Sequence, residues 1–173
     1  MIGRGAGTLQ VSLPLRSPWG ETAPLEAPRV GATAANFQAT TFEGETLSLA
    51  DLRGRPVLLD FWASWCPPCR DQVIPLKRMA VDYAGRLQIL GVSLDTDEKA
   101  FEAFVYNHHL PGRQIRDGGW FGPIASLYRV ADAGLPCVIL IDAEGRITAI
   151  GAGPAGLEED IRRAVAAAPK EPG

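Results

Sequence analysis

A pair of cysteines separated by two prolines constrains this chain more than any other feature. Cys66-Pro67-Pro68-Cys69 follows the apolar run 57–62 and precedes a segment with a helical amphipathic stripe. The pair is therefore expected where a buried strand ends and a helix begins. The first turn of a helix carries unpaired N–H groups and the positive end of the helix dipole, which lower the pKa of a thiol there. Because the thiolate is the species that attacks a disulfide, this setting indicates a redox-active dithiol.

The same cysteine spacing also occurs in structural zinc sites, which need four ligands in tetrahedral geometry. Only Cys137, His108 and His109 remain as candidate ligands, and none of them repeats the spacing. Pro67 and Pro68 also favour the redox interpretation, since a proline early in a helix lacks an N–H that would be unpaired anyway. The sequence therefore indicates no metal site and no cofactor.

Composition narrows the remaining classes of protein. A chain of 173 residues suits one domain with a substantial core. Its net charge of −3 gives no basic field for nucleic acid, and three cysteines are too few for a disulfide scaffold. No stretch near the N-terminus is apolar enough for a signal peptide or a membrane span. We expect a monomer without a membrane segment, in the cytoplasm if the chain is complete.

The order of apolar segments predicts an α/β fold. Residues 1–30 are rich in glycine and proline and lack a period, so we expect an extended arm there and one domain over 31–173. The order of strands and helices predicts a mixed sheet with helices on both faces. The expected elements are a hairpin turning at 43–44, a helical turn at 49–54, strands at 57–62 and 87–94, helices at about 67–83 (kinked at Pro75), 97–109 and 123–128, a hairpin of 137–141 and 146–150, and a last helix at about 155–167.

Several motifs in a fixed order resemble those of the thioredoxin-like proteins of the TlpA/ResA type, close to the branch used in cytochrome c maturation. The resemblance spans roughly residues 30–168 and rests on 31–37, 43–56, 61–70, 134–136 and 141–147. It implies a thioredoxin fold with a strand–helix insertion, here over 101–128. It also implies a cis-proline at Pro136 beside the disulfide, presenting backbone to an extended substrate. An extracytoplasmic or periplasmic location, usual for the family, is implied if the chain is a shortened form.

The expected chemistry is a thiol–disulfide exchange. Cys66, nearest the helix N-terminus and at the exposed end of the motif, is expected to attack a partner disulfide, and Cys69 to resolve the mixed disulfide. The cycle needs protein or peptide disulfide substrates and an upstream electron donor, and the family branch favours reduction over oxidation. The candidate substrate-binding residues are Trp65, Pro67, Pro68, Leu135 and Pro136.

Asp60 is the third candidate catalytic residue. A carboxylate in an apolar strand must raise its pKa or find a partner. It lies six residues before Cys66, as the buried acid of thioredoxin does, so we hypothesise that it exchanges a proton with Cys69 during resolution. The alternative is an aspartate at the strand end, held by a backbone hydrogen bond.

The chain departs from the family pattern at several positions. Cys137 stands where the family carries threonine or serine after the proline. It is either a small buried hydrophobe or a third thiol that traps a mixed disulfide or binds a metal. Gln72 replaces a glutamate, with Asp71 as a possible substitute acid, and Trp120 either packs or lines a partner groove. Residues 95–98 are expected to be a solvated loop and a helix start, with Asp95 or Thr96 as the cap.

Two other functions compete with the oxidoreductase. A peroxidase of the peroxiredoxin group needs threonine or serine three residues before its reactive cysteine, and Ala63 occupies that position before Cys66. A non-catalytic interaction module would instead bind copper or zinc through Cys66 and Cys69. Neither alternative uses the strand-to-helix setting as directly as the disulfide exchange does.

Overall fold

The computed structural model describes residues 27–169. The extended arm expected at 1–30 falls mostly on residues 1–26, which lie outside the described residues. The strands are β1 (Gln38–Thr40), β2 (Thr46–Ser48), β3 (Val57–Trp62), β4 (Gln88–Ser93), β5 (Arg113–Arg116), β6 (Cys137–Ile141) and β7 (Ile147–Gly151). The helices are η1 (Leu49–Leu52), α1 (Pro67–Asp71), α2 (Val73–Asp82), α3 (Glu98–His108), α4 (Pro123–Leu127), α5 (Val130–Ala133), η2 (Pro154–Leu157) and α6 (Glu158–Ala167).

Five strands form one mixed sheet in the order β5-β4-β3-β6-β7. The pairs β3–β4 and β4–β5 are parallel, whereas β6 runs antiparallel to both β3 and β7. The central strand β3 is buried at all six positions, which explains why residues 57–62 show no polar alternation. The α/β fold with a mixed sheet, predicted from the order of apolar segments, is confirmed.

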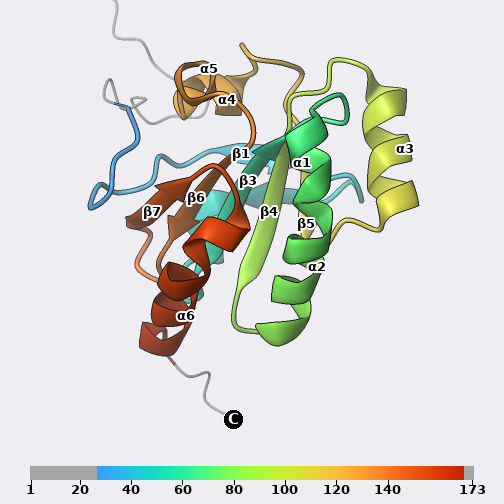
Figure 1. The fold of residues 1–173 in the computed structure, drawn as a ribbon. Helices are drawn as coiled ribbons and strands as arrows, with labels where there is room; N and C mark the ends of the chain where they lie inside the picture. The colour runs from blue at the N-terminus through green and yellow to red at the C-terminus, as the bar shows by residue number, and fades with distance from the viewer. Residues whose placement is uncertain (1–26, 170–173) are drawn as a thin grey trace, which may run out of the picture.

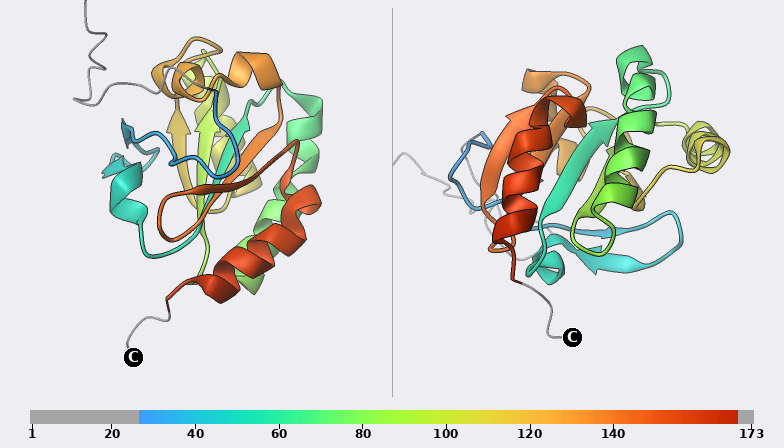
Figure 2. Two further views of the ribbon diagram at one scale, coloured as in Figure 1. Left: turned by 90° about the vertical axis from the view of Figure 1, so that its left-hand side faces the viewer. Right: turned by 60° about the horizontal axis from the view of Figure 1, so that its bottom comes forward.

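Two apolar cores cover the two faces of this sheet. One core joins Leu58, Val138 and Leu140 to α2 and α6, which lie in front of the sheet in Figure 1. The larger core joins alternate residues of the same strands, such as Leu59 and Ile139, to the β1–β2 hairpin, η1 and α4. Figure 2 shows η1 and the hairpin on the face opposite α2 and α6.

The long helix expected at 67–83 is divided by Gln72 into α1 and α2. Pro75 lies three residues after this division. Because a proline has no N–H, Pro75 leaves the carbonyl group of residue 71 without its helical donor. At the division itself, the N–H of Gln72 bonds to the carbonyl oxygen of Cys69 at 3.1 Å, three residues back, which is a tighter turn than an α-helix makes. The kink expected at Pro75 therefore appears as a break one turn earlier, and α1 is left as a short helix of its own.

Neither β5 nor α5 follows from the sequence pattern. The strand β5 has only four residues, with arginine at both ends, and it lies at the edge of the sheet next to β4.

The helix α3 begins after Asp97, whose side chain accepts hydrogen bonds from the N–H groups of Lys99 and Ala100. The prediction that Asp95 or Thr96 would cap this helix is wrong, because Asp95 points into the protein.

Candidate active site

Cys66 and Cys69 form a disulfide where β3 ends and α1 begins, at the upper end of the sheet in Figure 1. Cys66 is the N-cap residue of α1 and Pro67 occupies its first position. The carbonyl oxygen of Cys66 accepts hydrogen bonds from the N–H groups of Cys69 and Arg70, at 3.1 and 3.3 Å. The predicted strand-to-helix setting of the cysteine pair is confirmed, with Cys66 at the N-terminus of α1, where the helix dipole is positive.

The disulfide is covered, in contrast to the expectation that Cys66 lies at an exposed end. Cys66 is 4% exposed and Cys69 is 5% exposed. The residues around them are open, because Pro67 and Pro68 are exposed and Trp65 is 50% exposed. The two prolines and the indole ring therefore form an exposed rim around the covered disulfide, which a partner would meet first.

Trp65 contacts a second indole across the site. Its ring centroid lies 6.0 Å from that of Trp120, with the planes 49° apart. Trp120 is partly buried and packs against the larger core, while Phe121 beside it is 90% exposed. This aromatic pair places the loop between β5 and α4 next to the cysteine motif, so both predicted roles of Trp120, packing and lining, fit its position.

The antiparallel pairing of β6 with β3 brings the proline segment to the same end of the sheet. Cys137, the first residue of β6, pairs with Phe61 near the end of β3. Leu135 and Pro136 precede it, are partly buried, and are joined by a cis peptide bond. The structure therefore gathers the candidate substrate-binding segment and the disulfide at one edge.

Asp60 lies inside β3, opposite Val138 and Gly91 in the neighbouring strands, and only 4% of it is exposed. Its Oδ1 atom has no hydrogen-bond partner among residues 27–169. Burial raises the pKa of this carboxyl group to about 7. The alternative of a strand-end aspartate held by a backbone hydrogen bond does not fit this position. A buried carboxyl group that titrates near neutral pH can both accept and release a proton under ordinary conditions.

Cys137 is a free thiol that is 5% exposed and packs in the larger core. Burial and, secondarily, the charge of Asp60 raise the pKa of this thiol to about 11. A thiol with such a pKa is almost entirely protonated at pH 7 and is a poor nucleophile. These properties favour the buried hydrophobe over the third reactive thiol.

Asp95 is the site residue that the sequence analysis missed. It was expected in a solvated loop, but it is 1% exposed and accepts hydrogen bonds from both the N–H and the hydroxyl group of Ser64. Ser64 lies two residues before Cys66. One signal was available: residues that follow parallel strands β3 and β4 meet at the same edge of the sheet. The charged run 95–98 hid it, because three of its four residues are acidic, as in a surface loop, and residues 96–98 are indeed exposed.

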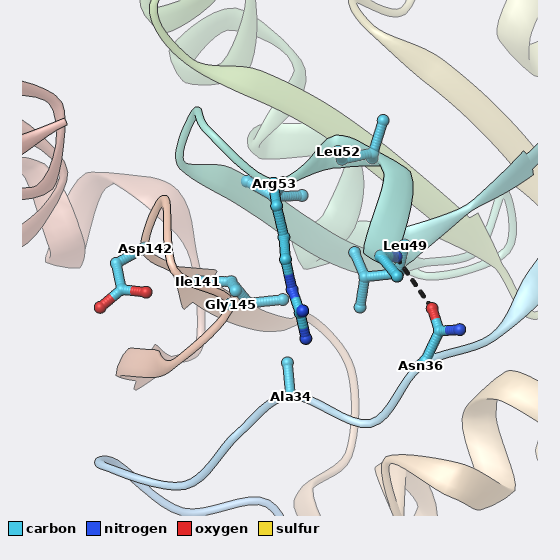
Figure 3. Close-up of a pocket in the computed structure, with 10 residues that line it drawn as sticks. Ala34, Asn36, Leu49, Leu52, Arg53, Ile141, Asp142 and Gly145 are labelled. Carbon is cyan, nitrogen blue, oxygen red and sulfur yellow. Dashed lines mark hydrogen bonds between the residues drawn. The ribbon is translucent and has the colours of Figure 1, made fainter. Parts of the chain in front are cut away.

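A small pocket lies at the opposite end of the sheet, beside η1. Val57 and Ile141, which pair at that end of β3 and β6, line it together with Arg53 and Asn36. In Figure 3 the side chain of Arg53 lies along the pocket, and Asn36 accepts a hydrogen bond from the N–H of Ala50. These residues tie η1 to the domain and do not contribute to the cysteine site.

Among residues 27–169, no three histidine, cysteine or acidic side chains gather as a metal-ligand set would. Over the same residues, no helix has the length and apolar character needed to cross a membrane.

Sequence comparisons agree with this site. The AhpC/TSA family matches residues 30–150, more than half of the chain. The thiol-disulfide oxidoreductase ResA of Bacillus cereus is 32% identical over 123 residues, which cover 70% of this chain and 69% of ResA. The thioredoxin-like protein YneN of Bacillus subtilis is 39% identical over 83 residues, 46% of this chain. The matched part spans about half of YneN, 49% of its length.

Solved structures agree as well. A thiol-disulfide oxidoreductase from Bacteroides fragilis superposes with a TM-score of 0.68 at 33% identity, covering 76% of this chain and 98% of that one. The thioredoxin domain of a thiol-disulfide oxidoreductase from Bacteroides vulgatus superposes with a TM-score of 0.70 at 24% identity, covering 80% and 99%. At that identity the second likeness shows the thioredoxin fold alone.

Proposed function

The chain belongs to the AhpC/TSA family and is a thiol–disulfide oxidoreductase of the TlpA/ResA type within the thioredoxin superfamily, and we propose that it reduces disulfides in protein partners. The observation that carries the proposal is the Cys66–Cys69 disulfide at the N-terminus of α1. The proposed direction, reduction, follows from the family branch that the sequence resembles. We further propose that residues 31–173 act as one domain and that the protein works as a monomer.

The proposed cycle transfers two electrons to the partner. The Cys66 thiolate attacks one sulfur of the partner disulfide, and a Cys66–partner bond forms as the partner's other sulfur leaves as a thiolate. The Cys69 thiolate then attacks the Cys66 sulfur, which forms the Cys66–Cys69 disulfide and releases the second partner thiolate. Both released thiolates take up protons. An upstream dithiol donor restores the reduced protein by the same exchange in reverse.

Asp60 supplies the proton acceptor in this proposal. In the reduced protein Cys69 is a thiol, and it must lose its proton before it can attack the mixed disulfide. The carboxyl group of Asp60 has no hydrogen-bond partner for Oδ1 within residues 27–169, and its pKa of about 7 lets it accept that proton at physiological pH. The proton later returns to solvent or to the leaving thiolate. An Asp60→Asn variant is expected to lose the pH dependence of disulfide reduction near pH 7.

The proposed substrate-binding surface is the rim around the disulfide. Trp65, Pro67 and Pro68 are exposed and carry no charge, so they suit an apolar segment of a partner. Leu135 and Pro136 immediately precede β6, so their backbone is placed to form main-chain hydrogen bonds with an extended peptide. This surface favours a polypeptide over a small disulfide, because a small molecule leaves most of it unused.

The geometry of the site does not support the alternative function, a peroxidase. The side chain of Ala63, three residues before Cys66, is fully buried and has no hydroxyl group to bind a peroxide. The hydroxyl group of Ser64, next to it, is already bonded to Asp95. A peroxide-consumption assay tests this directly, and turnover comparable to disulfide reduction would overturn the proposed function.

The deciding experiment is a redox titration of the Cys66–Cys69 couple against glutathione or dithiothreitol buffers. Trp65 lies beside the disulfide, so tryptophan fluorescence reports its state. A potential near or below about −250 mV supports a reductase supplied by a thioredoxin-like donor. A value above about −150 mV makes the protein an oxidant. A chain without a reversible two-electron couple is not an oxidoreductase, and stoichiometric metal after purification then identifies a binding module.

A further inference from the structure

Asp95 connects the strand β4 to the loop that leads into the cysteine motif. It follows β4 by two residues, and β4 lies parallel to β3, so its side chain reaches the chain just beyond β3. The N–H of Leu94 donates to the carbonyl oxygen of Trp62 at 2.8 Å and holds the two strand ends together. Asp95 is therefore fixed at the place where residues 63–66 turn from the sheet into α1.

Three donors converge on the Asp95 carboxylate. Oδ2 accepts from the N–H of Ser64 at 3.0 Å and from the hydroxyl group of Ser93 at 2.6 Å, while Oδ1 accepts from the hydroxyl group of Ser64 at 2.7 Å. The N–H of Asp95 in turn donates to the Ser93 hydroxyl oxygen at 3.0 Å. A buried carboxylate with this many good donors is held in one orientation. Two of the three donors belong to Ser64, so the network acts mainly on that residue.

The other side of Ser64 is held by α1. The Nε atom of Arg70 donates to the carbonyl oxygen of Ser64 at 2.8 Å. The N–H of Cys66 donates to the carbonyl oxygen of Ala63 at 3.1 Å and closes a tight turn over residues 63–66. Asp95 from the sheet and Arg70 from the helix therefore fix Ser64 between them, and Ser64 carries the turn that ends at Cys66.

This arrangement matters most after the disulfide opens. In the oxidised protein the bond to Cys69 itself holds Cys66 against α1. In the reduced protein that bond is gone, and the position of the Cys66 sulfur depends on the turn over 63–66. The helix N-terminus stabilises a thiolate only while the sulfur stays within its first turn. A contact that fixes the turn therefore stabilises the reduced form more than the oxidised form.

We propose that Asp95 is a positioning residue for disulfide exchange: by holding Ser64, it keeps the sulfur of Cys66 at the N-terminus of α1 when the disulfide is reduced. The proposal rests on the proposed function, in which Cys66 is the attacking thiol. Asp95 acts through the backbone turn and does not touch the reacting atoms. The two oxygen atoms of the Asp95 carboxylate matter because they bind Ser64, and the negative charge of the group is not required.

The geometry and the charge of Asp95 predict opposite effects on Cys66. A negative charge near a thiolate disfavours it, so removing only the charge lowers the pKa of the Cys66 thiol. Losing the turn moves the thiolate away from the helix N-terminus, so removing the hydrogen bonds raises that pKa. Asp95→Asn separates the two, because its amide oxygen can accept from the Ser64 N–H and its NH₂ group can donate to the Ser64 hydroxyl oxygen.

The test compares Asp95→Ala, Asp95→Asn and Ser64→Ala in the full chain. Asp97→Ala is the matched control: its carboxylate also accepts from backbone N–H groups, but those of Lys99 and Ala100 in α3. The pKa of Cys66 is taken from the pH dependence of its alkylation by iodoacetamide, located by mass spectrometry. The equilibrium constant with glutathione is measured on the same proteins, together with urea unfolding of the oxidised and the reduced forms.

We expect Asp95→Ala to slow alkylation of Cys66 at pH 6 by about threefold to tenfold, the range that helix-terminus effects span. The glutathione equilibrium shifts by the same factor toward the oxidised protein, up to about 30 mV for a tenfold change. Asp95→Asn stays within about twofold of the wild type, and Ser64→Ala falls between the two. Asp97→Ala loses stability in both forms without a change at Cys66.

Specific results overturn the proposal. Equal destabilisation of the oxidised and reduced forms by Asp95→Ala, with an unchanged glutathione equilibrium, makes Asp95 a structural residue only. Faster alkylation of Cys66 in Asp95→Asn shows that the charge acts and not the geometry. If Asp95→Ala does not fold, an unchanged Cys66 in Ser64→Ala is the refuting result. A wild-type chain without a reversible couple refutes the proposed function itself, which is a separate outcome.

Discussion

Replacing Asp60 by asparagine is expected to stabilise the oxidised protein in a way that depends on pH. Asp60 is 4% exposed in the central strand, and its Oδ1 atom lacks a hydrogen-bond partner within residues 27–169. Burial raises the pKa of the carboxyl group from 3.8 to about 7. The ionised form is therefore tolerated poorly in the folded protein, and Asp60→Asn removes the ionisation while keeping the shape of the side chain.

The magnitude follows from the two pKa values. A difference between 3.8 in the unfolded chain and about 7 in the folded protein corresponds to about 4 kcal/mol. Well below pH 3.8 the carboxyl group of Asp60 is protonated in both states, so it contributes no such penalty. Between pH 4 and 7 the folded protein holds a proton that the unfolded chain has lost, so the free energy of unfolding falls as the pH rises. Above pH 7 the full penalty of about 4 kcal/mol is present.

The difference between variant and wild type therefore changes with pH, whatever its value at low pH. The asparagine NH₂ group needs a hydrogen-bond acceptor, as the protonated carboxyl group does. Because the amide does not titrate, any cost it adds to the free energy of unfolding is a constant offset, the same at every pH. We expect Asp60→Asn to gain about 3 to 4 kcal/mol relative to the wild type between pH 4.5 and pH 8. The offset moves the whole curve but does not change this gain.

The assay is urea unfolding of the oxidised protein at half-unit steps from pH 4.5 to pH 8, followed by tryptophan fluorescence. Asp51→Asn, at an exposed residue of η1, controls for the loss of one negative charge. A stability difference that stays constant across this range refutes the reasoning, because it means that the Asp60 carboxyl group has the same pKa in the folded and the unfolded chain. The same measurement decides whether Asp60 is available as a proton acceptor near pH 7.

Three further outcomes are expected. Cys69→Ser should accumulate a mixed disulfide between Cys66 and a protein substrate, visible on a non-reducing gel, and a variant that still turns over refutes the resolving role. Because the pKa of the Cys137 thiol is raised to about 11, iodoacetamide at pH 8 should leave Cys137 unmodified in the native reduced protein, and rapid alkylation there contradicts its burial. Phe121→Ser should raise the KM for a protein disulfide about threefold to tenfold, with little change for a small aromatic disulfide, if a partner covers this 90% exposed ring. Tyr106→Ser, which removes another exposed ring on α3, is the control and should change neither value.

The sequence predicted the central elements because their signals are local. Residues 57–62 are apolar except for Asp60, which predicts a buried strand. The two cysteines and two prolines that follow predict the start of a helix directly after it. The structure has β3 and α1 there, with Cys66 as the N-cap. The fold class also followed, because the order of strands and helices leaves few arrangements of a mixed sheet.

The resemblance implied a strand within residues 101–128, but the residue pattern did not locate β5, because its position depends on tertiary contacts. The strand β5 has only four residues, and its buried pair Gln114 and Ile115 shows no period that separates a strand from a loop. Its place is set by β4: Gly91 lacks a side chain where Gln114 lies, and a Cβ atom there would stand 2.0 Å from the Gln114 amide oxygen. Trp62 also donates to that oxygen, at 3.1 Å. A sequence pattern records none of these pairings.

The burial of the disulfide escaped prediction for the same reason. The helix start suggested that Cys66 would be the accessible cysteine, yet both cysteines are nearly covered. The exposure of Cys66 depends on side chains that other segments place around it. One of these segments, the loop that carries Trp120, is more than fifty residues away from Cys66 in the sequence. The consequence for function is that selectivity resides in the rim, because any partner sulfur must pass it to reach Cys66.

Three aspartates at this end of the sheet differ in the donors they receive, and this difference separates their roles. Asp117 accepts from two backbone N–H groups at the start of α4, so it fixes the loop that carries Trp120. Asp95 accepts from three donors on Ser64 and Ser93, so its orientation is fixed. Oδ1 of Asp60, in contrast, has no donor among the described residues, and its carboxyl group is left free to gain and lose a proton. The sequence suggested burial for Asp60 alone, whereas the donors around each carboxylate distinguish two aspartates that hold the site in place from one that can take part in its chemistry.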